Sequence, residues 1–232
     1  MIDHERDLVS VREATDRLLD AAASWDNAAA AEPSRLPGWT RGHVLAHLAR
    51  NADALVNVLE GRPMYPDAAT READIERDAY RPLDVQLADV RESADRLRAV
   101  GERPADWSRT VELRNGVTDS AARVPFRRWV EVALHHVDLG AGYGLEDLPE
   151  EFVLREIEFL ADRWSGRPEV PPVTLRLDPG EGPSWRTGGT GGTPVVLAGT
   201  GPELLGWLSG RGDKGARLVV LSGDGLPELP PL

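Results

Sequence analysis

Hydrophobic residues recur at helical spacing through most of the first 165 positions of the chain. In residues 8–25 the apolar positions lie three or four apart, which places them on one face of a helix. A second helix is predicted to begin after Thr40, a good N-cap residue, and to end near Glu60, just before Gly61. The same spacing predicts helices over residues 68–78, 83–100, 125–139 and 152–164.

Two other segments have the pattern of β-structure. Residues 107–113 alternate apolar and polar positions, and Asn115-Gly116 just beyond them is a strong hairpin signal. After Gly166, short β-like runs broken by glycine and proline surround one short helix, residues 201–210. The pattern predicts an α+β protein, with a helical domain over residues 1–165 and a small α+β domain over residues 166–232.

Charge and composition narrow the possible partners and location. The formal net charge is −12, from 39 acidic and 27 basic side chains, so the chain lacks the basic excess of a nucleic-acid-binding protein. No apolar run is long enough to span a bilayer, and the N-terminus lacks the apolar core of a signal peptide. We therefore expect a cytoplasmic protein without nucleic-acid or membrane partners. Nothing in the sequence calls for a dimer, so a monomer is the expectation.

Cysteine is absent and lysine occurs once, at Lys214. The absence of cysteine excludes disulfides, thiolate metal ligands and a cysteine nucleophile. Any thiol chemistry would therefore need a thiol from outside the chain. The use of arginine for almost all positive charge, with many alanines and glycines, indicates a high-GC bacterial origin.

The few histidines are the main candidates for chemistry. Glu131 and His135 are four residues apart on the predicted 125–139 helix, so their side chains lie on one face. The second predicted helix carries His43 and His47, also four apart. Zinc is often bound by two histidines and one carboxylate, with a fourth position left open. If the two helices pack antiparallel in a bundle, one of these histidines can complete such a site with Glu131 and His135.

Simpler explanations of these residues remain open at this point. The histidines can be ordinary core or surface residues, and Glu131 can pair with Arg127 or Arg128 on its own helix. A metalloprotease motif is excluded, because Val44 stands where a glutamate must follow the first histidine. Two histidines and one carboxylate also suit non-haem Fe(II).

Residues 36–55 (LPGWTRGHVLAHLARNADAL) and 128–144 (RWVEVALHHVDLGAGYG) resemble the mycothiol-dependent maleylpyruvate isomerase family of actinobacteria. This family is part of the wider DinB-like group of metal-binding four-helix bundles. The resemblance extends to the overall layout and to a C-terminal segment, residues 205–211 (LGWLSGR). It implies that His47, Glu131 and His135 are zinc ligands and that Arg211 handles an anionic substrate.

The resemblance also implies an activity. Mycothiol, bound to the zinc as a thiolate, would add to the cis double bond of maleylpyruvate, and its elimination after rotation would leave fumarylpyruvate. Arg211 would hold a carboxylate or stabilise developing charge. One alternative is a transferase that attaches mycothiol, or another small thiol, to an electrophile. A second is a non-catalytic module whose metal only braces the helices.

Overall fold

The computed structural model describes residues 2–178 and 182–230. The chain divides into two compact units, Met1–Tyr143 and Gly144–Leu232. The first is helical and the second combines helices with a sheet, which confirms the predicted α+β class. No helix in the described residues combines the length and the apolar composition that crossing a bilayer requires.

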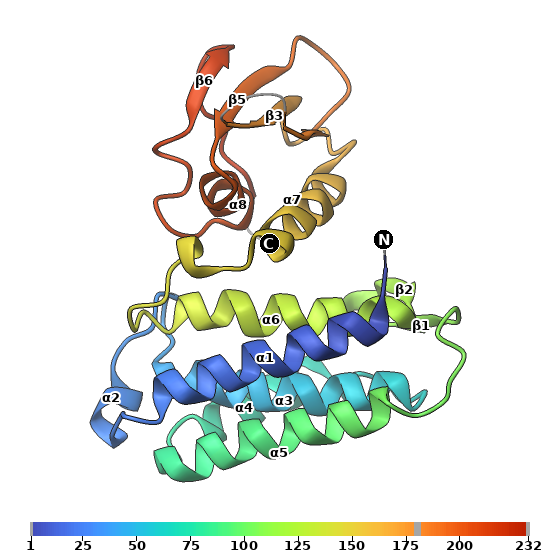
Figure 1. Cartoon of the computed structure of the whole chain (residues 1–232), viewed down its shortest axis with the longest axis vertical. Coiled ribbons are helices and arrows are strands. Elements are labelled where there is room, and N and C mark those ends of the chain that lie inside the picture. Colours follow the sequence, from blue (N-terminus) through green and yellow to red (C-terminus); the bar gives the residue numbers. More distant parts are fainter. Residues whose placement is uncertain (1, 179–181, 231–232) are drawn as a thin grey trace. The chain divides into compact units, whose positions relative to one another are not determined.

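Four long helices form the helical unit (Figure 1). Helix α1 packs against α5 and α6, and α3 packs against the same two helices, so the four enclose one core. This arrangement is the four-helix bundle that the resemblance implies. The four helices are α1 (His4–Ala22), α3 (Arg41–Leu59), α5 (Leu83–Gly101) and α6 (Val124–Asp138).

Helix α3 is buried along most of its length. It contacts α4 (Ala68–Asp78) as well as α5 and α6, and Val44, Leu45 and Leu48 along it have no exposed surface. A helix covered on several sides buries polar residues together with apolar ones. His47 and Asn51 are therefore buried, each less than 5% exposed, and must find partners inside the unit.

The ends of α3 and α6 follow the sequence signals. Thr40 is the N-cap of α3, and its side chain accepts from the His43 backbone N–H while His43 Nδ1 accepts from the Thr40 N–H. Pro125 lies in the first turn of α6, and Gly140 takes φ +66° just beyond its end. The start of α3 and both ends of α6 therefore lie where the sequence signals predicted them, to within one residue.

Shorter elements complete the helical unit. The predicted hairpin is present, with Glu112 paired to Thr118, and Asn115 and Gly116 both have positive φ. The predicted helix over residues 68–78 is α4. One helix was missed, because no element was predicted between residue 25 and Thr40. The elements are α2 (Asn27–Ala31), β1 (Thr110–Glu112), η1 (Arg114–Gly116), β2 (Thr118–Ser120) and η2 (Ala121–Arg123).

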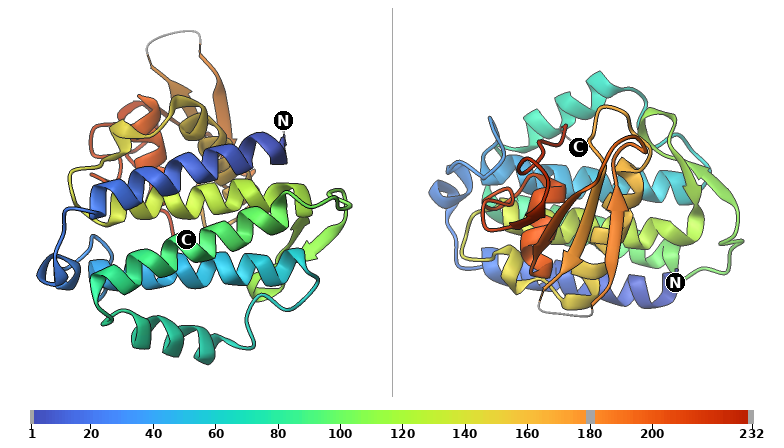
Figure 2. Two further views of the ribbon diagram at one scale, coloured as in Figure 1. Left: turned by 60° about the horizontal axis from the view of Figure 1, so that its bottom comes forward. Right: turned by 90° about the horizontal axis from the view of Figure 1, so that it is seen from above.

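The C-terminal unit holds a four-stranded mixed sheet in the order β4-β3-β5-β6, whose strands can be followed in Figure 2. Strand β3 pairs parallel with β5, and the two outer pairings are antiparallel. Helix α8 packs against α7, β3 and β5. The elements are η3 (Leu145–Asp147), α7 (Glu150–Trp164), β3 (Val173–Leu177), β4 (Ser184–Thr187), β5 (Val195–Gly199), α8 (Gly201–Ser209) and β6 (Val219–Ser222).

The boundary between the units differs from the one expected. The sequence placed it after residue 165, whereas the structure places it between Tyr143 and Gly144. Helix α7 accounts for the difference, because it packs on α8 and β4 within the C-terminal unit. Helical spacing identifies an amphipathic helix but does not say which core buries its apolar face.

Candidate metal centre

Helices α3 and α6 run antiparallel, as the candidate site requires. Near the start of α3, Arg41 Nε donates to the carbonyl of Leu139, just after α6, at 2.9 Å. Further along α3, the Leu48 carbonyl accepts from Arg128, near the start of α6, at 2.8 Å. The second turn of α3 therefore lies opposite the second half of α6.

This packing brings His47, Glu131 and His135 together. His47 Nε2 lies 2.9 Å from Glu131 Oε2, and His135 Nε2 lies 3.3 Å from the same oxygen. The two imidazole rings meet edge to face, with centroids 4.7 Å apart. One candidate ligand atom from each residue lies within 4.8 Å of the other two. Two nitrogens and one oxygen converging in this way are a donor set that zinc accepts.

The outer nitrogen of each histidine is also engaged. His135 Nδ1 lies 2.8 Å from Asp138 Oδ2, and Asp138 is 1% exposed. A carboxylate on the outer nitrogen of a metal-binding histidine fixes its tautomer and ring orientation. On His47, Arg71 Nη2 of α4 lies 3.2 Å from Nδ1. Because a guanidinium can only donate, Nδ1 accepts there, and the proton of neutral His47 is on Nε2.

The pKa values of His47 and Glu131 favour the forms of these residues that bind a metal. Burial is the largest influence on His47 and lowers its pKa to about 4, against the hydrogen bond to Glu131 that raises it. Burial opposes ionisation of Glu131, yet hydrogen bonds to His135 and His47 hold its pKa well below the usual range. At neutral pH His47 is thus neutral and Glu131 ionised, the ligating forms.

His135 differs in the direction of its shift. Burial lowers its pKa, but hydrogen bonds to Asp138 and Glu131 outweigh burial and raise the pKa above the ordinary value. A metal ion would therefore compete with a proton at this residue more than at His47.

An ion pair between Glu131 and an arginine of its own helix was the simpler explanation, but Arg127 and Arg128 bond to other residues. Arg127 Nε donates to Asp119 at 2.8 Å, and Arg128 Nη1 donates to Asn51 Oδ1 at 2.8 Å. The carboxylate of Glu131 instead meets the two histidines.

The remaining histidines of the two helices have structural contacts. His43 caps α3 through Thr40, and its Nε2 lies 3.1 Å from Glu76 Oε2. His136 is buried and stacks on Tyr143, with ring centroids 3.9 Å apart. Of the two histidines on α3, His47 is therefore the one that meets Glu131.

Arg211 lies in the C-terminal unit, directly after α8. Gly210 ends that helix with φ +67°, and the Arg211 backbone N–H then donates to the Gly206 carbonyl at 2.9 Å. Its Nη1 donates to the Ser209 carbonyl at 3.2 Å. These contacts belong to the C-terminal unit alone, so the substrate role of Arg211 stays a prediction.

Two residues beside the centre were missed from the sequence. Asp138 stands three positions after His135, a spacing that puts it on the same helix face and could have identified it. Arg71 has no comparable local signal. It comes from α4, and its contact with His47 depends on how α4 packs against α3.

The fold and the site define a class of proteins, helical bundles in which two antiparallel helices bring two histidines and a glutamate to one point. The family model described as the mycothiol maleylpyruvate isomerase N-terminal domain matches residues 11–140. The model for the MDMPI C-terminal domain matches residues 147–231. The chain belongs to this family, as the resemblance predicted.

Two solved structures are similar to nearly the whole chain. One is a crystal structure of the mycothiol-dependent maleylpyruvate isomerase, with 27% identity and a TM-score of 0.85. The other is a histidine-to-alanine mutant of that enzyme, with 28% identity and a TM-score of 0.87. Each comparison covers 99% of this chain and 97% of the other. A comparison with curated protein sequences gives no match. The family membership confirms the expectation that this protein is an enzyme.

Proposed function

We propose that this protein is a zinc- and mycothiol-dependent isomerase that converts maleylpyruvate to fumarylpyruvate. The observation that carries the proposal is the convergence of His47, Glu131 and His135 within 4.8 Å. It supports an isomerase because the chain belongs to the mycothiol maleylpyruvate isomerase family along both of its units.

The three residues would hold the zinc ion through His47 Nε2, His135 Nε2 and a Glu131 oxygen, and would leave a fourth position open. A zinc ion bound there supplies Lewis acidity, which favours the thiolate form of mycothiol at neutral pH. The absence of cysteine from the chain is consistent with a thiol that comes from outside. The single carboxylate leaves part of the metal charge uncompensated, which suits an anionic thiolate.

The neighbouring side chains control where the histidine protons are held. Asp138 keeps a proton on His135 Nδ1 and so leaves Nε2 free to act as a ligand. When His47 Nε2 serves as a ligand, the proton of its neutral ring is held on Nδ1. Arg71 then loses its acceptor on that ring and becomes available to another anion.

Arg211 is proposed to bind a carboxylate of the substrate. Its guanidinium offers two parallel donors, which match the two oxygens of a carboxylate. Its backbone N–H is bonded back to Gly206 after the turn at Gly210, which fixes the point on the C-terminal unit where its side chain begins.

The activity is tested with zinc-loaded protein and maleylpyruvate, with and without mycothiol, scored for fumarylpyruvate and for free thiol. We expect fumarylpyruvate only when mycothiol is present, with the thiol fully recovered, because substrate and product are isomers. Thiol consumed in proportion to the substrate would favour the transferase instead. No conversion of maleylpyruvate by the zinc-loaded protein would sink the isomerase proposal.

The metal centre is tested separately by metal analysis of purified variants. Replacement of His47, Glu131 or His135 by alanine should each remove the bound metal, because two ligands hold zinc far less tightly than three. His136→Ala is the matched control, since it removes a buried histidine next to the site without removing a ligand. Full zinc occupancy in all three ligand variants would refute the assignment of the ligands. If the wild-type protein contained iron instead of zinc, the proposed metal would be iron.

A further inference from the structure

A cleft of about 620 Å³ lies within the helical unit, beside the metal centre but not containing its three candidate ligands. It is formed by the end of α3, the segment leading into α4, the first turn of α4, and β1 with the turn η1 that follows it. Its apolar lining includes Val58, Met64 and Leu113. A concave surface that combines apolar walls with converging polar groups is typical of small-molecule sites.

The polar lining of this cleft is unusually basic for the chain. Four of the 27 basic residues line it, in a protein with net charge −12. They face two acidic residues in the lining, Asp67 and Glu112, and Asp67 is already engaged as the N-cap of α4. The four are Arg62, Arg71, Arg109 and Arg114.

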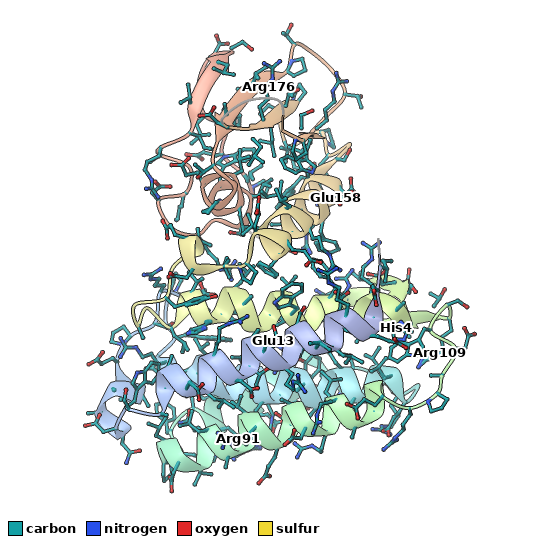
Figure 3. The ribbon with its side chains drawn as sticks, viewed as in Figure 1. His4, Glu13, Arg91, Arg109, Glu158 and Arg176 are labelled. Carbon is teal, nitrogen blue, oxygen red and sulfur yellow. The ribbon has the colours of Figure 1, made fainter. Side chains whose placement is uncertain are left out.

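Two of these arginines are arranged to receive an anion. Arg109, labelled in Figure 3 at the end of the bundle near His4, donates through Nη2 to the Leu59 carbonyl at 2.5 Å. Its Nη1 is buried and has no hydrogen-bond partner within the described residues. Arg71 is 10% exposed, and its guanidinium lies over the Tyr65 ring at 5.8 Å from the centroid. Buried donors of this kind bind anions strongly.

A carboxylate of the chain itself already lies between two of the cleft arginines. Glu72 Oε1 lies 2.5 Å from Arg71 Nη1 and 3.9 Å from Arg114 Nη2. The Glu72 side chain is 56% exposed, so water can replace its contacts when another carboxylate competes. The position of Glu72 indicates that a carboxylate fits between these two guanidinium groups.

Arg71 connects the cleft to the metal centre. The same guanidinium that lines the cleft lies 3.2 Å from His47 Nδ1. A molecule with a carboxylate on Arg71 would therefore lie beside the metal ligands, and a second carboxylate could extend along the cleft towards Arg109.

We propose that this cleft binds a small dicarboxylate, with Arg71 and Arg114 holding one carboxylate in place of Glu72 and Arg109 receiving the other. The choice of a dicarboxylate over other anions rests on the proposed function, because the substrate there has two carboxylates. Arg71, Arg109 and Arg114 then determine substrate specificity from the helical unit, independently of Arg211.

The test is calorimetric binding of maleate to the zinc-loaded full-length protein without thiol, so that no turnover occurs. Loss of a charged donor should weaken maleate binding about tenfold or more in Arg71→Gln and Arg109→Gln. Arg114→Gln should weaken it less, because this side chain is 46% exposed. Glu72→Gln should strengthen binding, since it removes the competing carboxylate, and a merely structural role would not give this opposite sign.

Arg98→Gln is the matched control, because Arg98 is also 46% exposed and its partners lie on or just after α5, outside the cleft. Unchanged maleate affinity in Arg114→Gln and Glu72→Gln would overturn the proposal even if Arg71→Gln failed to fold. Phosphate binding as tight as maleate, or no maleate binding to the wild type, would also overturn it.

The result is separable from that of the isomerase assay. The expected affinity pattern without conversion of maleylpyruvate would support the cleft and refute the proposed function. Conversion with a KM unchanged in Arg114→Gln and Glu72→Gln would refute the cleft and leave the proposed function standing.

Discussion

Replacing Asp138 tests the metal centre without removing a ligand, because Asp138 contacts the proposed ligand His135 and is not a ligand itself. Its Oδ2 lies 2.8 Å from His135 Nδ1, and the side chain is almost fully buried. Asp138→Asn keeps the shape and one accepting oxygen but removes the negative charge. The variant therefore isolates the effect of that charge on how well His135 Nε2 binds a metal.

The expected size of the effect follows from the role of such outer carboxylates. Their mutation typically weakens metal binding about 10- to 100-fold, which is about 1.4 to 2.7 kcal/mol. Because asparagine can still accept the Nδ1 hydrogen bond, we expect the result near the lower end. Zinc at saturating concentration should still bind with a stoichiometry of one, since all three ligands remain.

The assay is competition with a chromogenic zinc chelator at neutral pH. Asp119→Asn serves as the control, because it makes the same change at another aspartate of the helical unit, one that is partly buried and paired with Arg127 rather than with a histidine. We expect weaker zinc binding in Asp138→Asn alone. Equal zinc affinity in wild type and both variants would refute the reasoning, because His135 would then need no outer carboxylate.

Three further predictions address the site, the substrate and the packing. In metal-free protein the His47 pKa of about 4 lies below that of an unfolded histidine. The unfolded chain therefore binds more protons than the folded chain between about pH 6.5 and 4. As the pH is lowered through this window, the free energy of unfolding measured by urea titration should decrease, and more steeply in the wild type than in His47→Gln. Arg211→Gln should lower kcat/KM for maleylpyruvate about tenfold while zinc content stays unchanged, and an unaltered kcat/KM would contradict its substrate role. Gly42→Ala should destabilise the protein by about 1–3 kcal/mol, because its Cβ would lie 2.3 Å from the Ala79 carbonyl oxygen. Thermal unfolding of both variants measures this effect. Gly191→Ala should be nearly neutral, because a Cβ at position 191 would have no atom within 4 Å.

The sequence predicted the elements whose signals are local. Thr40 caps a helix, Gly140 follows the end of one, and Asn115-Gly116 forms a hairpin, because each signal acts within a few residues. Spacing alone also placed Glu131 and His135 on one helix face. The short helix α2 was missed, since its five residues carry too little periodicity to separate a helix from a loop.

Features that depend on packing between segments were not predictable in the same way. The assignment of α7 to the C-terminal unit depends on which core covers its apolar face. The contact between Arg71 and His47 joins α4 to α3, and no pattern along the chain encodes it. The spacing of His43 and His47 left either one possible, and the family resemblance, not the periodicity, favoured His47.

The centre depends on the register between α3 and α6, which buried polar contacts fix. Arg128 has no exposed surface, and its Nη1 donates to the Leu48 carbonyl and to Asn51. Burial lowers the Arg128 pKa to about 10, so the side chain is still charged at neutral pH and must keep these acceptors. A shift of α6 by one residue would turn its side chains by about 100°, which would unpair Arg128 and carry Glu131 away from His47. The buried arginine one turn before Glu131 thus specifies the alignment that the proposed metal ligands need.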